Sequence, residues 1–299
     1  MSNFELSGSQ SYVTKEQIIP PSIPVGEFWV KFWGVRGLIP TPCTNTHRYG
    51  GNTACIEIYV AGKRLIFDGG TGLRILGRTW QKLHQRLEAH LFFTNSQSSH
   101  IQGFPFFAPA FLTDNCFHIY GTAASNGASI KQCLGDQMLQ PLFPYPLQAM
   151  QSQLHFYNLS EGSVVKLDDV TITTALINQN QRSVGYRVTD QKCSVAYVTD
   201  LHKNLDKVER DRILQIIHDA DLLIANATYN PPTAYNHAAT DVHWKTAVEL
   251  AKSAGVKQLV ISQHHPDDKD DFLDKVQLEI QSIFPKALLA CEGLVLSVE

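Results

Sequence analysis

The chain has 299 residues, of which 43% are hydrophobic and 18% are charged, a composition typical of a globular protein with a sizeable core. Its formal net charge of −3 gives no electrostatic footprint for nucleic acid or for an anionic membrane surface. Neither nucleic acid nor a membrane is therefore indicated as a partner.

The six cysteines are scattered and form no Cys-x-x-Cys pair, so we interpret them as reduced thiols. Residues 1–27 are polar and do not resemble a signal peptide. No uninterrupted apolar run approaches the roughly 18 residues that a membrane-spanning helix needs. We therefore expect a cytoplasmic protein.

The first 26 residues differ from the rest of the chain. Residues 1–26 lack a clear hydrophobic period and contain Pro20, Pro21 and Pro24, which favours an N-terminal arm or tail without regular structure. Residues 27–299 are expected to form one domain.

Two strand-rich blocks follow one another along this domain. The first has predicted strands at 28–34, 54–60, 63–67, 91–93 and 117–120, and the second at 164–167, 170–176, 184–188 and 193–198. Between them we expect a helix at 125–138 and a proline-broken connection at 141–150. Helices at 206–220, 240–255 and 268–284 alternate with short strands at 222–225 and 259–262. Two mostly antiparallel strand sets with helices outside them predict an α+β fold, a four-layer αββα sandwich.

Polar loops follow two of the predicted buried strands. Leu91, Phe92 and Phe93 lead into the polar run 94–100, and the strand at 63–67 leads into Asp68 and a glycine-rich turn before a helix. In α/β proteins the chemistry lies at such strand ends. We therefore expect both loops to contribute to one site.

Six segments together resemble the metallo-β-lactamase fold superfamily over about residues 28–296, and within it the ribonuclease Z and cyclic-phosphodiesterase-like hydrolases. They are Gly34-Val35-Arg36-Gly37, Arg48-Tyr49-Gly50-Gly51-Asn52-Thr53, Asp68-Gly69-Gly70-Thr71-Gly72, Gly185-Tyr186-Arg187, Val198-Thr199-Asp200 and Gln263-His264-His265-Pro266-Asp267-Asp268.

The resemblance implies a central loop of the form His-x-His-x-Asp-His that binds two divalent metals. At the corresponding positions this chain has Asn95, Gln97, Ser99 and His100. Three of the four expected ligands are therefore absent, and only His100 is retained.

The remaining positions that the resemblance implies are also altered. The histidine before Gly-Tyr-Arg corresponds to Gln179, whereas the bridging aspartate is retained as Asp200. The final metal histidine corresponds to Gln263, although a slip of one residue would place His264 there. The general-acid histidine corresponds to Asp241, and His243 lies two residues away.

These replacements argue against a dinuclear metal site. Neutral amides are poor ligands for Zn²⁺, so we expect no metal and no other cofactor. Asn, Gln and Ser both donate and accept hydrogen bonds, and they could satisfy one another together with Asp68 or Asp200. We expect a metal-free polar pocket, and an eroded pocket without a role is the alternative interpretation.

The leading hypothesis is a pseudoenzyme, a catalytically inactive superfamily member that acts as a binding, scaffold or regulatory protein. Its partner would be an unknown small polar ligand or a protein, and a homodimer is possible because the resembled hydrolases often form dimers. One alternative is a residual metal-dependent hydrolase, a phosphodiesterase or ribonuclease Z-like enzyme. It would use one Zn²⁺ or Mn²⁺ ion on His100, Asp200 and His264.

A second enzymatic alternative uses Asp200 and Asp241 without metal, with His243 as a further catalytic candidate. A third interpretation is an interaction protein that docks its partner through the N-terminal arm and the surface of the fold.

Overall fold

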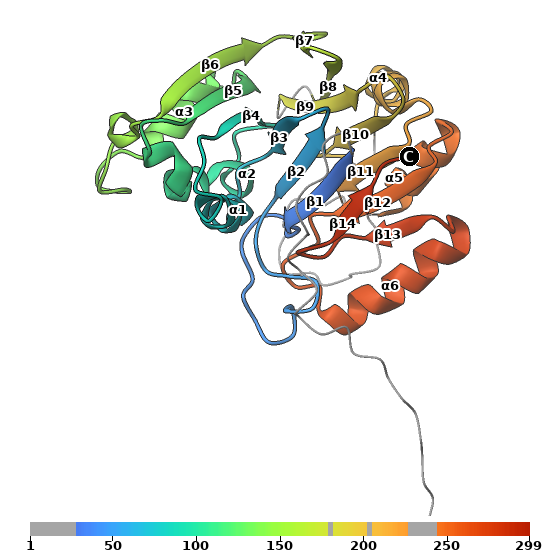
Figure 1. The fold of residues 1–299 in the computed structure, drawn as a ribbon. Helices are drawn as coiled ribbons and strands as arrows, with labels where there is room; N and C mark the ends of the chain where they lie inside the picture. Colours follow the sequence, from blue (N-terminus) through green and yellow to red (C-terminus); the bar gives the residue numbers. More distant parts are fainter. Residues whose placement is uncertain (1–27, 179–181, 202–204, 227–243) are drawn as a thin grey trace, which may run out of the picture.

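The computed structural model describes residues 28–178, 182–201, 205–226 and 244–299. Two sheets of seven strands pack face to face, and helices cover their outer faces (Figure 1). The predicted four-layer αββα sandwich is confirmed. The predicted N-terminal arm, residues 1–26, lies outside the described residues.

The first sheet has the strand order β14-β1-β2-β3-β4-β5-β6. In chain order its strands are β1 (Trp29–Gly34), β2 (Cys55–Val60), β3 (Lys63–Phe67), β4 (Glu88–Phe92), β5 (Cys116–Thr122), β6 (Gln153–Leu159) and β14 (Val295–Ser297). The helices of this half are α1 (Gly72–Gln81), α2 (Ser98–Ile101) and α3 (Ile130–Asp136), with 3-10 turns at Phe104–Phe106, Ala108–Phe111 and Leu147–Ala149.

The second sheet has the order β13-β12-β11-β10-β9-β8-β7. Its strands are β7 (Val164–Leu167), β8 (Val170–Asn178), β9 (Ser183–Thr189), β10 (Ser194–Val198), β11 (Leu222–Asn226), β12 (Gln258–Ser262) and β13 (Ala287–Leu289). Its outer helices are α4 (Lys207–Ile217), α5 (Trp244–Ser253) and α6 (Asp270–Ile283).

The prediction of mostly antiparallel strands was wrong, because both sheets are mixed. Strands β3 to β6 pair in parallel in the first sheet, and β10 to β13 pair in parallel in the second. A parallel neighbour requires a crossover connection, and helices such as α1 and α4 provide it. Parallel strands end at the same edge of a sheet, so their following loops converge.

Aromatic side chains fill the core between the two sheets. The Phe67 ring stacks on Phe92 with centroids 5.2 Å apart and meets Tyr197 edge-on at 5.9 Å. On the outer face, Leu73, Leu76 and Trp80 recur at helical spacing along α1 and are buried against the first sheet. Each sheet therefore has one face in the central core and one face under helices.

Three strands on the same side of the sandwich are followed by a non-glycine residue that has a left-handed backbone conformation. Asp68, Asp200 and Gln263 follow β3, β10 and β12 closely, with φ angles of 60°, 57° and 57°. This conformation is uncommon for such residues and often accompanies functional sites. It turns the chain sharply where the candidate site lies.

Among the described residues, no helix is both long and apolar enough to cross a membrane.

Candidate functional site

The Asp68 carboxylate is the centre of a buried hydrogen-bond network. It is 1% exposed and accepts hydrogen bonds from the Thr94 backbone N–H at 2.8 Å, the Thr94 hydroxyl at 2.9 Å and the Tyr197 hydroxyl at 2.8 Å. Gln263 Nε2 in turn donates to the Tyr197 hydroxyl at 3.0 Å. Four strand ends are thus joined through one carboxylate.

The retained histidine of the central loop pairs with the same carboxylate. His100 Nδ1 lies 2.9 Å from Asp68 Oδ2 and 3.0 Å from the Thr94 hydroxyl. Burial lowers the pKa of His100, but the charge of Asp68 and its hydrogen bond outweigh burial, with a further contribution from Asp200, and the net shift is upward. Asp68 therefore favours the protonated, cationic imidazole.

The Asp200 carboxylate has neutral hydrogen-bond donors. Asn95 Nδ2 donates to Asp200 Oδ2 at 2.6 Å, and the fully buried Ser183 hydroxyl donates to the same oxygen. The Asn95 carbonyl oxygen accepts from the backbone N–H of Gln97 at 2.9 Å, which fixes the orientation of the amide. Asp200, the residue predicted to correspond to a metal-bridging aspartate, is thus held by an amide and a hydroxyl.

The structure separates the two adjacent candidates at the end of β12. Gln263 is directed into the network, whereas His264 is directed away from it, and its Nε2 lies 2.7 Å from the Ala290 carbonyl oxygen. Burial is the main cause that lowers the pKa of His264 to about 4, so the ring is neutral at neutral pH. The suggested one-residue slip was therefore wrong, because consecutive residues here point in opposite directions.

The other predicted residues fall into two groups. Ser99 is buried and Gln97 is exposed, and both belong to the segment that forms the start of α2. Gln179, Asp241 and His243 lie outside the described residues. The structure therefore brings together Asp68, Asn95, His100, Asp200 and Gln263 and leaves the general-acid positions as predictions.

Sequence reasoning missed three side chains of the network. The hydroxyls of Thr94 and Tyr197 donate to Asp68, and the hydroxyl of Ser183 donates to Asp200. Tyr197 and Ser183 lie in β10 and β9, where they could not be distinguished from ordinary strand residues. Thr94, a polar residue directly after a buried apolar strand, was the only one with a local signal.

The glycine-rich turn after Asp68 serves close packing. A Cβ atom on Gly70 would collide with the Ser99 carbonyl oxygen, and one on Gly103 would collide with the Gly70 carbonyl oxygen. The backbone N–H of Gly69 donates to the His100 carbonyl at 2.6 Å. These contacts fix the turn against α2, so the turn positions the network residues on both sides of it.

A fully buried arginine joins the first and last motif segments. Arg36 Nε donates to the Gly50 carbonyl at 2.7 Å, Nη1 donates to the Asp268 carbonyl at 2.8 Å, and Nη2 lies 4.0 Å from Asp270 Oδ1. The loop after β1 is thereby held beside the loop that carries Gln263.

A family model described as the beta-lactamase superfamily domain matches residues 63–264, two thirds of the chain. The chain belongs to the β-lactamase superfamily. A comparison with curated proteins gave no match.

Solved structures with low sequence identity share the fold of the chain. The metallo-β-lactamase fold protein YhfI from Bacillus subtilis is 18% identical with a TM-score of 0.64, covering 91% of this chain and 99% of its own. A diphosphatase of the PhnP family is 14% identical with a TM-score of 0.66, covering 91% and 98%. The short form of human tRNase Z is 18% identical with a TM-score of 0.58, covering 91% and 99%.

The residues of this chain do not fit the metal centre that such folds imply. Zn²⁺ sites use Cys, His and carboxylate ligands, and among the described residues no three such side chains form a metal-binding group. The candidate ligand positions already have protein partners. His100 Nδ1 pairs with the Asp68 carboxylate, and the Asn95 amide donates a hydrogen bond to Asp200. The Gln263 amide donates to the Tyr197 hydroxyl. The set His100, Asp200 and His264 is not assembled, because His264 points to Ala290.

Proposed function

We propose that this β-lactamase superfamily member is catalytically silent and acts by binding. The observation that supports this proposal is the environment of Asp200, where Asn95 and Ser183 supply the hydrogen bonds in place of two cations. Both bonds are made to Oδ2, so a metal that binds this oxygen must compete with two neutral donors. The proposed role is that of a scaffold or regulatory protein for a small polar ligand or a protein partner.

The Asp68 part of the network supports the same proposal. Without a metal, the buried Asp68 carboxylate beside the half-buried Asp200 needs compensating charge or hydrogen bonds. Asp68 has Thr94, Tyr197 and the cationic form of His100 as partners. These partners support the proposal that the network is stable without a metal. No described contact favours the residual hydrolase with one metal, since its third ligand, His264, points elsewhere.

Metal analysis tests this proposal. The protein would be purified without chelator, dialysed against metal-free buffer and analysed by mass spectrometry, and we expect well below one Zn²⁺ or Mn²⁺ per chain. A matched variant restores the superfamily ligands through Asn95→His, Gln97→His, Ser99→Asp and Gln263→His, and it should bind more metal than the natural chain. About two tightly held ions per natural chain, the dinuclear count, would overturn the proposal.

A further inference from the structure

Strand β6, Gln153–Leu159, forms the outer edge of the first sheet (Figure 1). It pairs in parallel with β5, and the Gln153 N–H donates to the carbonyl of the residue before β5 at 2.9 Å. Because alternate residues of a strand bond to the same neighbour, the backbone N–H and C=O groups of Leu154, Phe156 and Asn158 point away from the sheet. These are the groups that an added strand would bond.

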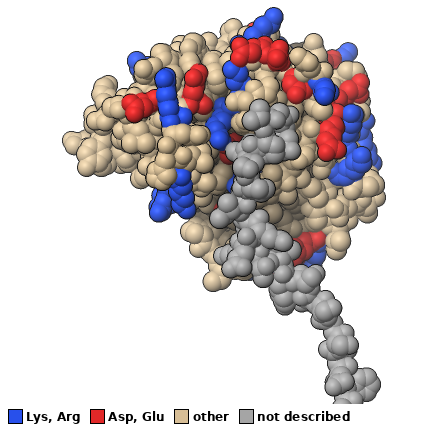
Figure 2. Space-filling model, in the orientation of Figure 1, with Lys and Arg blue, Asp and Glu red and all other residues tan. Residues whose placement is uncertain are grey.

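The sequence and register of β6 lack the devices that normally protect edge strands. Natural proteins use lysine, proline or bulges to prevent edge-to-edge pairing. Strand β6 has no proline, its register with β5 is unbroken, and residues 137–160 contain no Asp, Glu, Lys or Arg. Figure 2 shows the outermost part of this lobe, on the left, without charged side chains. A further strand can therefore approach without meeting a charge on β6 itself.

Two rows of stacked rings cross the first sheet and end at β6. In one row His90 stacks on His118 with centroids 4.7 Å apart, and His118 stacks on His155 at 5.2 Å. In the other row Tyr120 stacks on Tyr157 at 4.7 Å. These distances are close to the spacing of neighbouring strands. His155 is exposed and Tyr157 is 41% exposed, so each row ends in an exposed ring on the edge strand.

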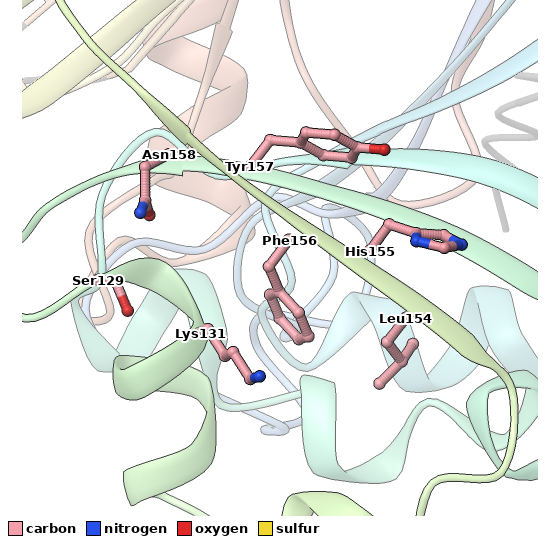
Figure 3. A pocket seen from close by; sticks show the side chains of 7 residues that line it. All are labelled: Ser129, Lys131, Leu154, His155, Phe156, Tyr157 and Asn158. Atoms are coloured by element: carbon pink, nitrogen blue, oxygen red, sulfur yellow. The ribbon is translucent and has the colours of Figure 1, made fainter.

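A cavity of about 400 Å³ runs along the edge of β6. Figure 3 shows Lys131 and Phe156 on one side of the strand and His155 and Tyr157 on the other. Lys131 Nζ lies 5.6 Å from the centre of the Phe156 ring, and Lys131 is the one Lys, Arg, Asp or Glu among the described residues that line the cavity. An added strand would therefore meet two rings on one face of the sheet and a cation on the other.

We propose that β6 binds an extended peptide as an eighth strand, and that this peptide has an acidic residue between two aromatic residues. The peptide residue opposite Phe156 shares its face of the sheet and lies near Lys131. The peptide residues before and after it lie beside His155 and Tyr157. Aromatic side chains at these two positions extend the rows of rings, and a carboxylate at the central position pairs with the lysine. The pattern reads the same in both chain directions, so it does not depend on the polarity of the peptide.

A second copy of the chain that paired through its own β6 would not meet these requirements. Residues 137–160 contain no acidic residue, so such a copy would place no carboxylate opposite Lys131. The partner is therefore a peptide of different sequence. The surface is formed by β6 and α3 rather than by the loops around Asp68, so this inference does not depend on the state of the metal loop.

Fluorescence anisotropy of a labelled peptide, Ser-Thr-Tyr-Glu-Tyr-Thr-Ser, tests the proposal on the full chain. We expect saturable binding, and about tenfold weaker binding of the matched peptide that has lysine in place of the central glutamate. Lys131→Glu should reverse this preference, because the charge opposite the central residue is then negative. The control Lys275→Glu changes an exposed lysine on α6 and should leave the preference unchanged. Added salt should reduce the difference between the two peptides.

Hydrogen exchange on the natural protein locates the peptide without a variant. The amides of Leu154, Phe156 and Asn158 should exchange more slowly when the peptide with glutamate is added. Four results would each overturn the proposal: no saturable binding, equal affinity for the two peptides, a preference that Lys131→Glu leaves unchanged, or binding that does not protect these amides. Protection of the same amides in the free chain, by its own N-terminal arm or by a second copy, would also overturn it.

Discussion

Replacing Asn95 by aspartate tests whether neutral donors stand in for cations at Asp200. Asn95 Nδ2 lies 2.6 Å from Asp200 Oδ2, so Asn95→Asp places two carboxylates in contact. At about 4 Å and an effective dielectric constant of about 20, two like charges repel by about 4 kcal/mol. One of the pair will therefore take up a proton in the folded protein.

The cost of protonating one of the two carboxylates sets the size of the loss in stability. Holding an ordinary aspartate, with a pKa of about 3.9, protonated at pH 7 costs about 4 kcal/mol. Asp200 is only half-buried, so solvent screening reduces the expected loss of stability to about 2–4 kcal/mol. The folded-state pKa of the pair is raised, so the loss is absent below about pH 4 and grows as pH rises.

The assay is urea unfolding of the variant and the natural chain at about pH 5 and pH 7.5. The difference in free energy of unfolding should be larger at the higher pH by on the order of 2 kcal/mol. The matched control is Asn95→Asp combined with Asp200→Asn, which exchanges donor and acceptor and should recover most of the stability. Equal stability of Asn95→Asp and the natural chain at both pH values, or no recovery in the double variant, would refute the reasoning.

Two further predictions follow from the buried network and its neighbour. Thr94→Val keeps the shape of the side chain but removes the hydroxyl that donates to Asp68, so it should lower the free energy of unfolding by about 2 kcal/mol, measured by urea titration. The exposed Thr79→Val serves as its control, and equal losses in both variants would contradict the assignment. His264 has its pKa lowered to about 4, so stability should be constant above its ordinary value of about 6.5 and fall between pH 6.5 and 4 by about 3 kcal/mol. His264→Gln should remove this part of the pH dependence. If the free energy of unfolding falls with pH as steeply in this variant as in the natural chain, the fold does not hold the ring neutral.

Most strands were predictable because burial leaves a local pattern. The segments at 63–67 and 164–167 coincide with β3 and β7, and the glycine turn after Asp68 leads into α1 as expected. Strand β6 was missed, although Gln153 to Tyr157 alternate between exposed and half-buried positions, because the apolar side chains of an edge strand are only half covered. An edge strand acquires its pairing from β5, and that partner is not visible in a local window.

The sequence by itself determined which residue types stand in the polar loop after β4. The residue types at Asn95, Gln97 and Ser99 are read directly from the chain, and their chemistry does not depend on where they lie. His100 and Asp200 are read from the chain in the same way, and their correspondence to metal ligands is what the resemblance implies.

Only the tertiary structure decided how these residues satisfy one another. That Gln263 rather than His264 faces the network depends on a left-handed turn after β12, and the hydrogen bond from Ser183 to Asp200 joins two residues 17 positions apart in the sequence. Such contacts arise from strand register and from the packing of two sheets, which no single segment encodes. The loop at Asn95 is therefore defined by its composition, but its hydrogen bonds are defined by the fold.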